Sequence, residues 1–243
     1  MIELYGGVSP NAIKILLMLE ELELPYKLHN VRVMQGEQYS PDFLVLNPLG
    51  KYPVIVDHEG AGVDQPIFES GAILMYLAET YGAQFLPASG PDRWETLKWL
   101  MVQMSWVGPM IGQHAHFRVQ PSEAGSYAAT RYSTIAQRVC EVLNDRLTHG
   151  EWLAGGQYTI ADMATFPWIN IGVNFGFDWW AYPTLVAWRE RIAARPAAVR
   201  ALAAVADLNK SFAADGPRNE EDLNKFFMRN GGPAVDYGVL GIR

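Results

Sequence analysis

Asn47-Pro48-Leu49-Gly50-Lys51-Tyr52-Pro53-Val54-Ile55-Val56, followed later by Glu69-Ser70-Gly71-Ala72-Ile73, is the sequence that decides the fold of this 243-residue chain. Proline cannot donate a ladder hydrogen bond, so we expect Pro53 at the entrance of a strand whose edge remains accessible. Glu69 and Ser70 precede apolar residues at three-to-four spacing, which predicts a helix that begins at this pair. The free amides and positive dipole of a helix start favour a carboxylate. The two segments together predict a site for a small extended peptide.

This combination resembles the glutathione-binding signature of the glutathione transferase family, and the resemblance covers about residues 1 to 205. In that family the proline is cis, and the backbone beside it binds the cysteinyl unit of glutathione. The Glu-Ser pair binds the γ-glutamyl end. The resemblance therefore implies that Tyr52, Pro53, Glu69 and Ser70 bind glutathione as a co-substrate.

Composition and charge exclude several classes of protein. A hydrophobic content of 49% with 12% aromatic residues is enough for a substantial core. The formal charge of −7 and the pI near 5.2, without clustered Lys and Arg, do not favour a nucleic-acid partner. The chain begins without a basic and apolar leader, and it contains no run of about eighteen apolar residues. We therefore expect a cytoplasmic protein with no membrane contact.

The first part of the chain alternates strand and helix patterns in the order βαβαββα, which is typical of a thioredoxin-like layer of sheet and helices. Ser9 followed by Pro10 is a favourable start for the first of these helices. The segments expected to form the strands and helices are residues 2–5, 11–22, 28–33, 41–46, 54–57, 67–68 and 71–81.

A Pro/Gly/Ser-rich stretch then precedes a part in which only helical patterns occur. Helices are expected at 92–117 with a kink at Gly108-Pro109, and at 123–147, 159–175, 184–194 and 197–208. The pattern predicts an α/β thioredoxin-like domain at 1–86, an all-α domain at 91–208 and an extension at 209–243.

Two further segments have structural interpretations. Thr159 and Asp162 have the spacing of a capping box, which we interpret as a device of folding. In the extension, residues 219–228 can form a short amphipathic helix, and residues 231–243 are expected to be irregular. We expect this tail to pack over the body or a partner near the mouth of the pocket, because its aromatic side chains need cover.

The chemistry is expected in the loop after the first strand, where thioredoxin-like redox proteins carry a reactive cysteine. No cysteine is present there, and the chain's single cysteine, Cys140, lies in a helical pattern that predicts a buried, inert thiol. Ser9 and Asn11 are the polar groups of the loop that can hydrogen-bond a glutathione sulfur. Local sequence alone favours a capping Ser9 and a solvated Asn11.

The loop also resembles that of the bacterial nu class of glutathione transferases, related to the yeast prion-type nitrogen regulator, although Ser9 replaces the threonine of that class. Members bind two glutathiones, or one glutathione disulfide, per subunit and reduce disulfides without an enzyme cysteine. The resemblance thus implies that Ser9 and Asn11 are catalytic and stabilise a thiolate. It also implies that Gln38 and Lys51 contact the glycyl end of glutathione, and that Arg131 reaches across a homodimer interface.

Residues 112–117 also resemble a nu-class segment, and we expect a co-substrate pocket there. His114 and His116 are two residues apart and do not share a helix face, so no metal site is expected. The residues expected to line the pocket for a small disulfide or electrophile are His114, Phe117, Trp168 and Tyr182.

The sequence therefore predicts a glutathione-dependent enzyme, with disulfide reduction favoured. Conjugation to an aromatic electrophile and removal of glutathione from a thioether use the same thiolate and remain alternatives. Domains that resemble glutathione transferases also serve as non-catalytic binding modules, which is a third interpretation.

Overall fold

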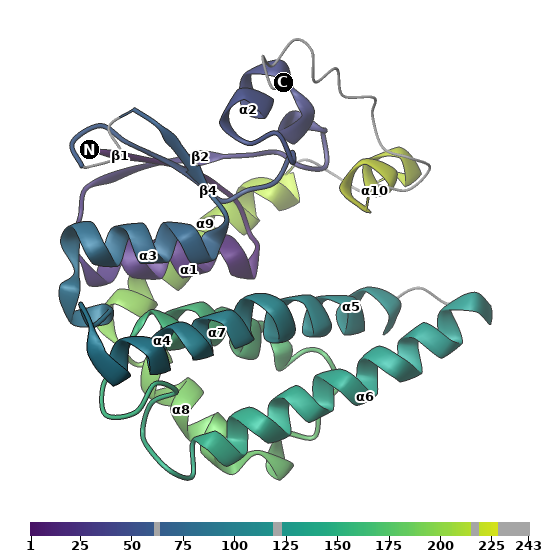
Figure 1. Ribbon diagram of the computed structural model, residues 1–243. Helices are drawn as coiled ribbons and strands as arrows, with labels where there is room; N and C mark the ends of the chain where they lie inside the picture. Colours follow the sequence, from purple (N-terminus) through teal and green to yellow (C-terminus); the bar gives the residue numbers. More distant parts are fainter. Residues whose placement is uncertain (61–63, 119–122, 215–218, 228–243) are drawn as a thin grey trace. The chain divides into compact units, whose positions relative to one another are not determined.

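The computed structural model of the chain describes residues 1–60, 64–118, 123–214 and 219–227 (Figure 1). These residues form two compact units. The sheet unit consists of Met1–Ile73 together with the described residues from Arg200 onward, and the helical unit consists of Leu74–Val199. The named strands of the described residues all belong to the sheet unit. The predicted class, a thioredoxin-like α/β part and an all-α part, is confirmed.

The sheet unit follows the predicted order βαβαββα. Its four strands lie in the order β2-β1-β3-β4, with β1 parallel to β2 and antiparallel to β3. The fourth strand pairs antiparallel with β3 at the edge. The elements are β1 (Ile2–Gly6), α1 (Pro10–Glu21), β2 (Tyr26–Asn30), α2 (Pro41–Leu46), β3 (Val54–Asp57), β4 (Pro66–Phe68) and α3 (Ser70–Tyr81), which begins in this unit.

The second strand differs from the predicted range of 28–33. The ladder between β1 and β2 ends at the pair Gly6 and Asn30, because β1 itself ends there. Val31 and Val33 therefore do not extend the strand. They are buried with Phe43 and Val54 in an apolar cluster of the same unit. The alternation of Val31 and Val33 correctly indicates that these side chains are buried. It does not show where the β1–β2 ladder ends, because that depends on the end of β1.

The predicted start of α1 is confirmed. Ser9 caps the helix, and its Oγ accepts a hydrogen bond from the Ala12 amide at 3.3 Å. Pro10 occupies the first helical position, where its missing N–H costs nothing. Residues from Ala12 to Leu19 are all buried, among them the charged Lys14.

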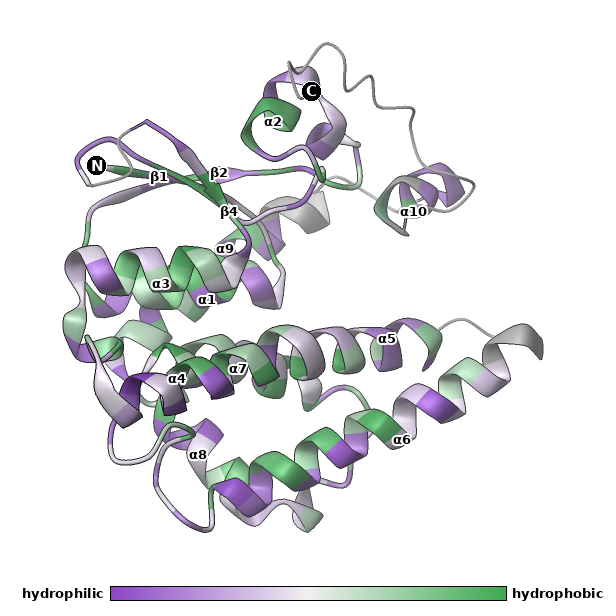
Figure 2. Cartoon of the chain, viewed as in Figure 1, coloured by the Kyte–Doolittle hydropathy of each residue, from purple (hydrophilic) through white to green (hydrophobic). Residues whose placement is uncertain are grey.

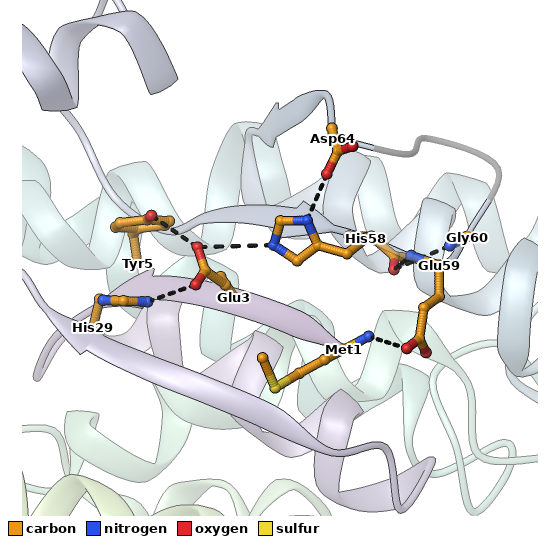
Figure 3. A network of polar contacts seen from close by, with 9 residues as sticks. Met1, Glu3, Tyr5, His29, His58, Glu59, Gly60 and Asp64 are labelled. Carbon is orange, nitrogen blue, oxygen red and sulfur yellow. Dashed lines mark hydrogen bonds and ion pairs between the residues drawn. The ribbon is translucent and has the colours of Figure 1, made fainter.

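A polar network lies on the sheet, as Figure 3 shows. Glu3 accepts a hydrogen bond from the Tyr5 hydroxyl at 3.1 Å, and its other oxygen lies 3.5 Å from Nε2 of His29. Tyr5 and His29 stack with ring centroids 4.6 Å apart. His58 pairs with Asp64 at 2.5 Å. Because these groups are partly solvated, we assign the network a modest structural role.

The helical unit contains α4 (Gly90–Val102), a π-helical turn (Gln103–Val107), α5 (Gly108–Arg118), α6 (Glu123–Arg146), α7 (Ile160–Gly172) and α8 (Pro183–Ala193), and α9 (Pro196–Ala214) begins in it. The helix predicted at 92–117 is thus interrupted, but one turn before the expected kink at Gly108-Pro109. Pro109 has no N–H to donate to the carbonyl four residues earlier, so the irregular backbone falls in the turn that precedes it.

Helix α7 is mostly green in Figure 2, and its residues from Ile160 to Pro167 are all buried. The predicted capping box at its start is confirmed. Asp162 Oδ2 accepts from the Thr159 amide at 3.0 Å, and Oδ1 accepts from the Leu153 amide and from Nε1 of Trp188, both at 2.9 Å. Burial raises the pKa of Asp162 to about 6, and these hydrogen bonds oppose the rise. The residue connects the start of α7 to its neighbours, which fits the structural role predicted for it.

The two remaining predictions about single elements concern α6 and the tail. Cys140 on α6 is buried, as predicted, and burial raises the pKa of its thiol to about 12. The predicted tail helix is present as α10 (Glu220–Phe227), whereas residues 228 and 231–243 lie outside the described residues. No helix in the described part of the chain combines the length and apolar character needed to cross a membrane.

Candidate functional site

A cavity of about 160 Å³ in the sheet unit is lined by part of the predicted site. Five of its lining residues were predicted from the sequence as catalytic or glutathione-binding groups, and they come from α1, the loop before α2 and the loop before β3. The full lining is Ser9, Asn11, Val33, Gln38, Gly50, Lys51, Tyr52 and Phe226. The fold thus brings together residues that lie far apart in the sequence.

The first wall of the cavity is the start of α1. Ser9 and Asn11 line it, on either side of Pro10. The N-terminal end of a helix carries a partial positive charge, which favours an anion such as a thiolate. The chain's single sulfhydryl, that of Cys140, belongs to the other unit and is buried. The wall can therefore stabilise a sulfur anion but brings no sulfur of its own.

The loop before β3 forms the second wall. Asn47 is buried and holds this loop, because its Nδ2 donates to the Lys51 carbonyl at 2.6 Å and its Oδ1 accepts from the Leu49 amide at 3.0 Å. Gly50 has a φ of +61°, a conformation that glycine adopts without a steric penalty. The Lys51 side chain is exposed at the rim. These local bonds fix the backbone that carries Lys51 into the site.

The peptide bond between Tyr52 and Pro53 is cis, as the family resemblance implies. The Tyr52 side chain lies in the cavity lining, and it also contacts the apolar cluster of Val33 and Phe43. Burial raises the pKa of the Tyr52 phenol, and a hydrogen bond with the Ser9 side chain opposes the rise. The family resemblance implied a role for Tyr52 through its backbone alone, because that signature does not depend on which side chain precedes the proline.

Gln38 contributes a buried polar group. Its side chain is 3% exposed, and Oε1 has no hydrogen-bond partner among the residues that the structure describes. A buried acceptor without a donor is costly, so such a group in a cavity lining indicates a place for a ligand donor.

Glu69 and Ser70 lie in the same unit, at the start of α3, although they are not among the residues that line the cavity. Glu69 has a φ of +68°, which is uncommon for a residue with a side chain and occurs preferentially at functional sites. Ser70 is buried, and its Oγ accepts a hydrogen bond from Nζ of Lys14 at 3.1 Å. Lys14 was missed because a lysine within an apolar helical pattern gives no sign of what its ammonium contacts.

Phe226 of α10 brings the tail to the cavity. The side chain lines the cavity with Gln38 and Lys51 and is 37% exposed. This is the position near the pocket mouth at which the tail was expected.

The remaining predicted residues belong to the helical unit. Arg131 is exposed on α6. Nε2 of His114 bonds the Phe175 carbonyl at 2.9 Å, and Phe117 stacks on Tyr132 with centroids 5.5 Å apart.

The two other residues assigned to the co-substrate pocket also have well-defined surroundings. The Trp168 ring lies against Gly108 and Gly112, where added β-carbons would lie within 3.4 Å and 3.3 Å of it. Tyr182 is buried beside Trp179. The assignment of these side chains to a co-substrate pocket stays a prediction. Within the described residues, no group of three or more His, Cys, Asp or Glu side chains is arranged to hold a metal ion.

Fold and site define a class: a thioredoxin-like sheet unit whose cavity at the first helix lacks a cysteine, joined to an all-helical unit. Family models agree with this class. Residues 1–79 match the glutathione S-transferase N-terminal domain, and residues 108–196 match the C-terminal domain. The chain belongs to the glutathione S-transferase family.

Individual relatives and solved structures are similar to most of this chain. The chain is 45% identical over 204 residues to the disulfide-bond oxidoreductase YfcG of Escherichia coli, a match that covers 83% of this chain and 94% of the relative. A glutathione transferase family member from Pseudomonas fluorescens, solved with two glutathione bound, is 40% identical with a TM-score of 0.74 and covers 83% and 92% of the two chains. A glutathione transferase from Pseudomonas putida, solved with one glutathione disulfide per subunit, is 36% identical with a TM-score of 0.75 and covers 83% and 90%.

Proposed function

We propose that this protein is a glutathione-dependent disulfide reductase that works without an enzyme cysteine. The observation that carries the proposal is the cavity at the start of α1, which presents Ser9 and Asn11 to a ligand but no thiol. The similarity to a disulfide-bond oxidoreductase and to structures with two glutathiones or one glutathione disulfide supports it.

Glutathione is a peptide with a charged group at each end, and the sheet unit offers partners for each part. Gln38 Oε1 is a buried acceptor that a peptide N–H can satisfy. Lys51 at the rim attracts the glycyl carboxylate. Glu69 binds the γ-glutamyl ammonium, and Ser70 with the start of α3 binds its carboxylate.

The chemistry is thiol–disulfide exchange between small molecules. The first glutathione loses its thiol proton to solvent, and its thiolate attacks one sulfur of the substrate disulfide. The S–S bond breaks, a mixed disulfide forms, and the leaving thiolate takes a proton from solvent. A second glutathione thiolate then attacks the mixed disulfide, which releases glutathione disulfide and the second substrate thiol. Two glutathiones are oxidised and one disulfide is reduced, so electrons balance without a group from the protein.

The protein's contribution is to lower the pKa of the glutathione thiol and to hold it in place. Hydrogen bonds to an anion and the helix dipole both favour the thiolate. A thiol titrates near 8.5, so a shift of about two units makes it largely ionised at neutral pH.

The test is the initial rate at which the purified protein, with millimolar glutathione, reduces a small model disulfide. We expect Asn11→Ala to lose at least about tenfold in rate, the effect of one hydrogen bond to a charged group. Cys140→Ala is the matched control and should keep the wild-type rate. Equal rates in wild type and Asn11→Ala, or a rate lost in Cys140→Ala, would contradict the proposal.

Conjugation remains a second candidate, because the same thiolate can attack an electrophilic carbon and a relative at 34% identity is named a glutathione S-transferase. A protein that binds glutathione but reduces no disulfide should be assayed with 1-chloro-2,4-dinitrobenzene and with a glutathione thioether. Binding without turnover in all three assays would indicate a binding module.

We further propose that the protein is a homodimer formed through α6 and the π-helical turn. A groove of about 290 Å³ with mainly apolar walls lies there, and the Trp106 side chain beside it is 54% exposed. An exposed apolar surface of this kind favours association. Arg131 lies on the same helix, which fits its predicted reach to the partner's glutathione. The groove is lined by Val102, Trp106, Arg138, Val139, Val142 and Leu143.

Sedimentation equilibrium tests the dimer. Trp106→Glu places a charge in the groove and should shift the protein toward the monomer. Trp180→Glu is the control and should leave the dimer intact, because Trp180 is 94% exposed and lies outside the groove. A wild-type monomer, or a Trp106→Glu dimer of unchanged stability, would contradict this assembly.

A further inference from the structure

The phenol of Tyr52 belongs to the cavity in which the glutathione thiolate is proposed to bind. It lines the cavity together with Ser9 and Asn11. A β-carbon built on Gly7 would lie 2.9 Å from the phenol oxygen, so the hydroxyl lies directly against the loop that follows β1. Its hydrogen bond with Ser9 places it beside the residue that begins α1.

The hydrogen bonds around this hydroxyl have a direction. The Ala12 amide donates to Ser9 Oγ at 3.3 Å. Ser9 in turn can donate its own hydrogen to the phenol oxygen, since a hydroxyl both accepts and donates. In that arrangement the Tyr52 hydroxyl has its own hydrogen left to donate to a ligand. In a series of hydrogen bonds that begins at the N-terminal end of a helix, each bond polarises the next, so the last hydroxyl donates more strongly to an anion.

The protonation of the phenol fits the role of a donor. Burial raises the pKa of Tyr52 above the usual value near 10, and the bond with Ser9 opposes the rise. At neutral pH the group therefore carries its proton. It can stabilise a neighbouring anion by hydrogen bonding, but it does not act as a base.

We propose that Tyr52 is a catalytic residue whose hydroxyl donates a hydrogen bond to the sulfur of bound glutathione, with Ser9 orienting the phenol from behind. The inference rests on the proposed glutathione site, and it adds a side-chain role to a residue for which the family resemblance implied only a backbone role. Tyr52 keeps its proton and forms no covalent bond. Ser9 then acts on the sulfur through Tyr52, whereas Asn11 lines the same cavity separately.

The measurement is the pKa of the glutathione thiol on the protein, followed by thiolate absorbance in the ultraviolet as pH is raised. We expect Tyr52→Phe to raise this pKa by about one unit, the effect of one hydrogen bond to an anion. The rate of disulfide reduction at pH 6.5 should fall about tenfold, and most of the loss should be recovered at pH 9. Tyr26→Phe is the matched control, because it removes a phenol hydroxyl that bonds Glu20 in the same unit, outside the cavity lining.

Gly7→Ala tests the same hydroxyl without changing Tyr52. The added methyl group would lie 2.9 Å from the phenol oxygen, which must therefore move away. We expect the thiol pKa to rise as in Tyr52→Phe, and the double variant to add little to either single change. This variant keeps the inference testable if Tyr52→Phe folds poorly.

The outcomes separate this inference from the proposed function. A lowered thiol pKa in wild type that rises in both Tyr52→Phe and Gly7→Ala supports the role of Tyr52. A lowered thiol pKa that stays unchanged in Tyr52→Phe overturns it but leaves the glutathione site intact. Glutathione that binds with the pKa of the free thiol overturns both the role of Tyr52 and the proposed stabilisation of a thiolate.

Discussion

Lys14 should make the stability of this protein rise with pH. Lys14 is 1% exposed, and burial lowers its pKa from 10.5 to about 7, while the nearby charge of Glu69 opposes the change. Below pH 7 the lysine is charged in both the folded and the unfolded chain, and the folded chain bears the full cost of the buried charge. Between pH 7 and 10.5 the unfolded chain binds more protons, so the free energy of unfolding increases with pH.

The magnitude follows from the two pKa values. At about 1.4 kcal/mol per unit of pKa, the change from 10.5 to about 7 corresponds to roughly 5 kcal/mol. Lys14→Met removes the titrating group and keeps a side chain of similar length. The difference in free energy of unfolding, wild type minus Lys14→Met, should therefore increase by roughly 5 kcal/mol from pH 6 to pH 11, mostly between pH 7 and 10.

The assay is urea denaturation at a series of pH values, followed by tryptophan fluorescence. Subtraction of the Lys14→Met curve cancels other groups that titrate at high pH, such as Cys140. Glu69→Gln is a second control, because loss of its charge should lower the pKa of Lys14 further and shift the rise to lower pH. A difference that stays flat between pH 7 and 10 would show that Lys14 titrates as it does in water, and the reasoning would be wrong.

Three further predictions concern other parts of the molecule. Asp162→Ala leaves the amides of Leu153 and Thr159 and the Trp188 indole without their acceptor. The free energy of unfolding, measured by urea denaturation, should therefore fall by at least about 3 kcal/mol. A loss below about 1 kcal/mol would contradict the network. Cys140, buried with a raised pKa, should react with a thiol reagent only after unfolding, and rapid reaction of the native protein would refute its burial. Phe226→Ala should change the KM for glutathione with little effect on stability, because the side chain lines the cavity and is 37% exposed. Removal of the chain after Leu208 should change the KM in the same way. An unchanged KM in both variants would exclude the tail from the site.

The fold could be predicted from the sequence where short-range rules decide. The cap at Ser9, the capping box at Thr159 and Asp162, and the order of elements all depend on local hydrogen bonding and on apolar periodicity. The end of β2 depends on where the neighbouring strand ends, and the π-helical turn depends on how the backbone before Pro109 accommodates the missing N–H. Apolar periodicity shows neither, so the predicted boundaries there were displaced.

The candidate site likewise contains residues that could be predicted from the sequence and residues that could not. The family resemblance implied that Gln38, Lys51 and Asn11 serve one glutathione site, and the structure places these residues in the lining of one cavity. The phenol of Tyr52 and the ammonium of Lys14 act through side chains whose direction depends on packing in three dimensions. A residue's type shows which chemistry it can supply, but only the packed structure shows which neighbour receives it.

A cavity without its own sulfhydryl has a consequence for damage by oxidants. Peroxides inactivate thiol enzymes by converting a reactive cysteine to its oxyacids, and the chain's single cysteine is buried with a thiol that resists ionisation. The sulfur at risk in the proposed reaction enters and leaves with each turnover. Oxidation of that sulfur consumes a replaceable small molecule and leaves the protein unchanged. The activity that the protein retains in the presence of peroxide therefore depends on how quickly the surrounding pool of reduced glutathione is renewed.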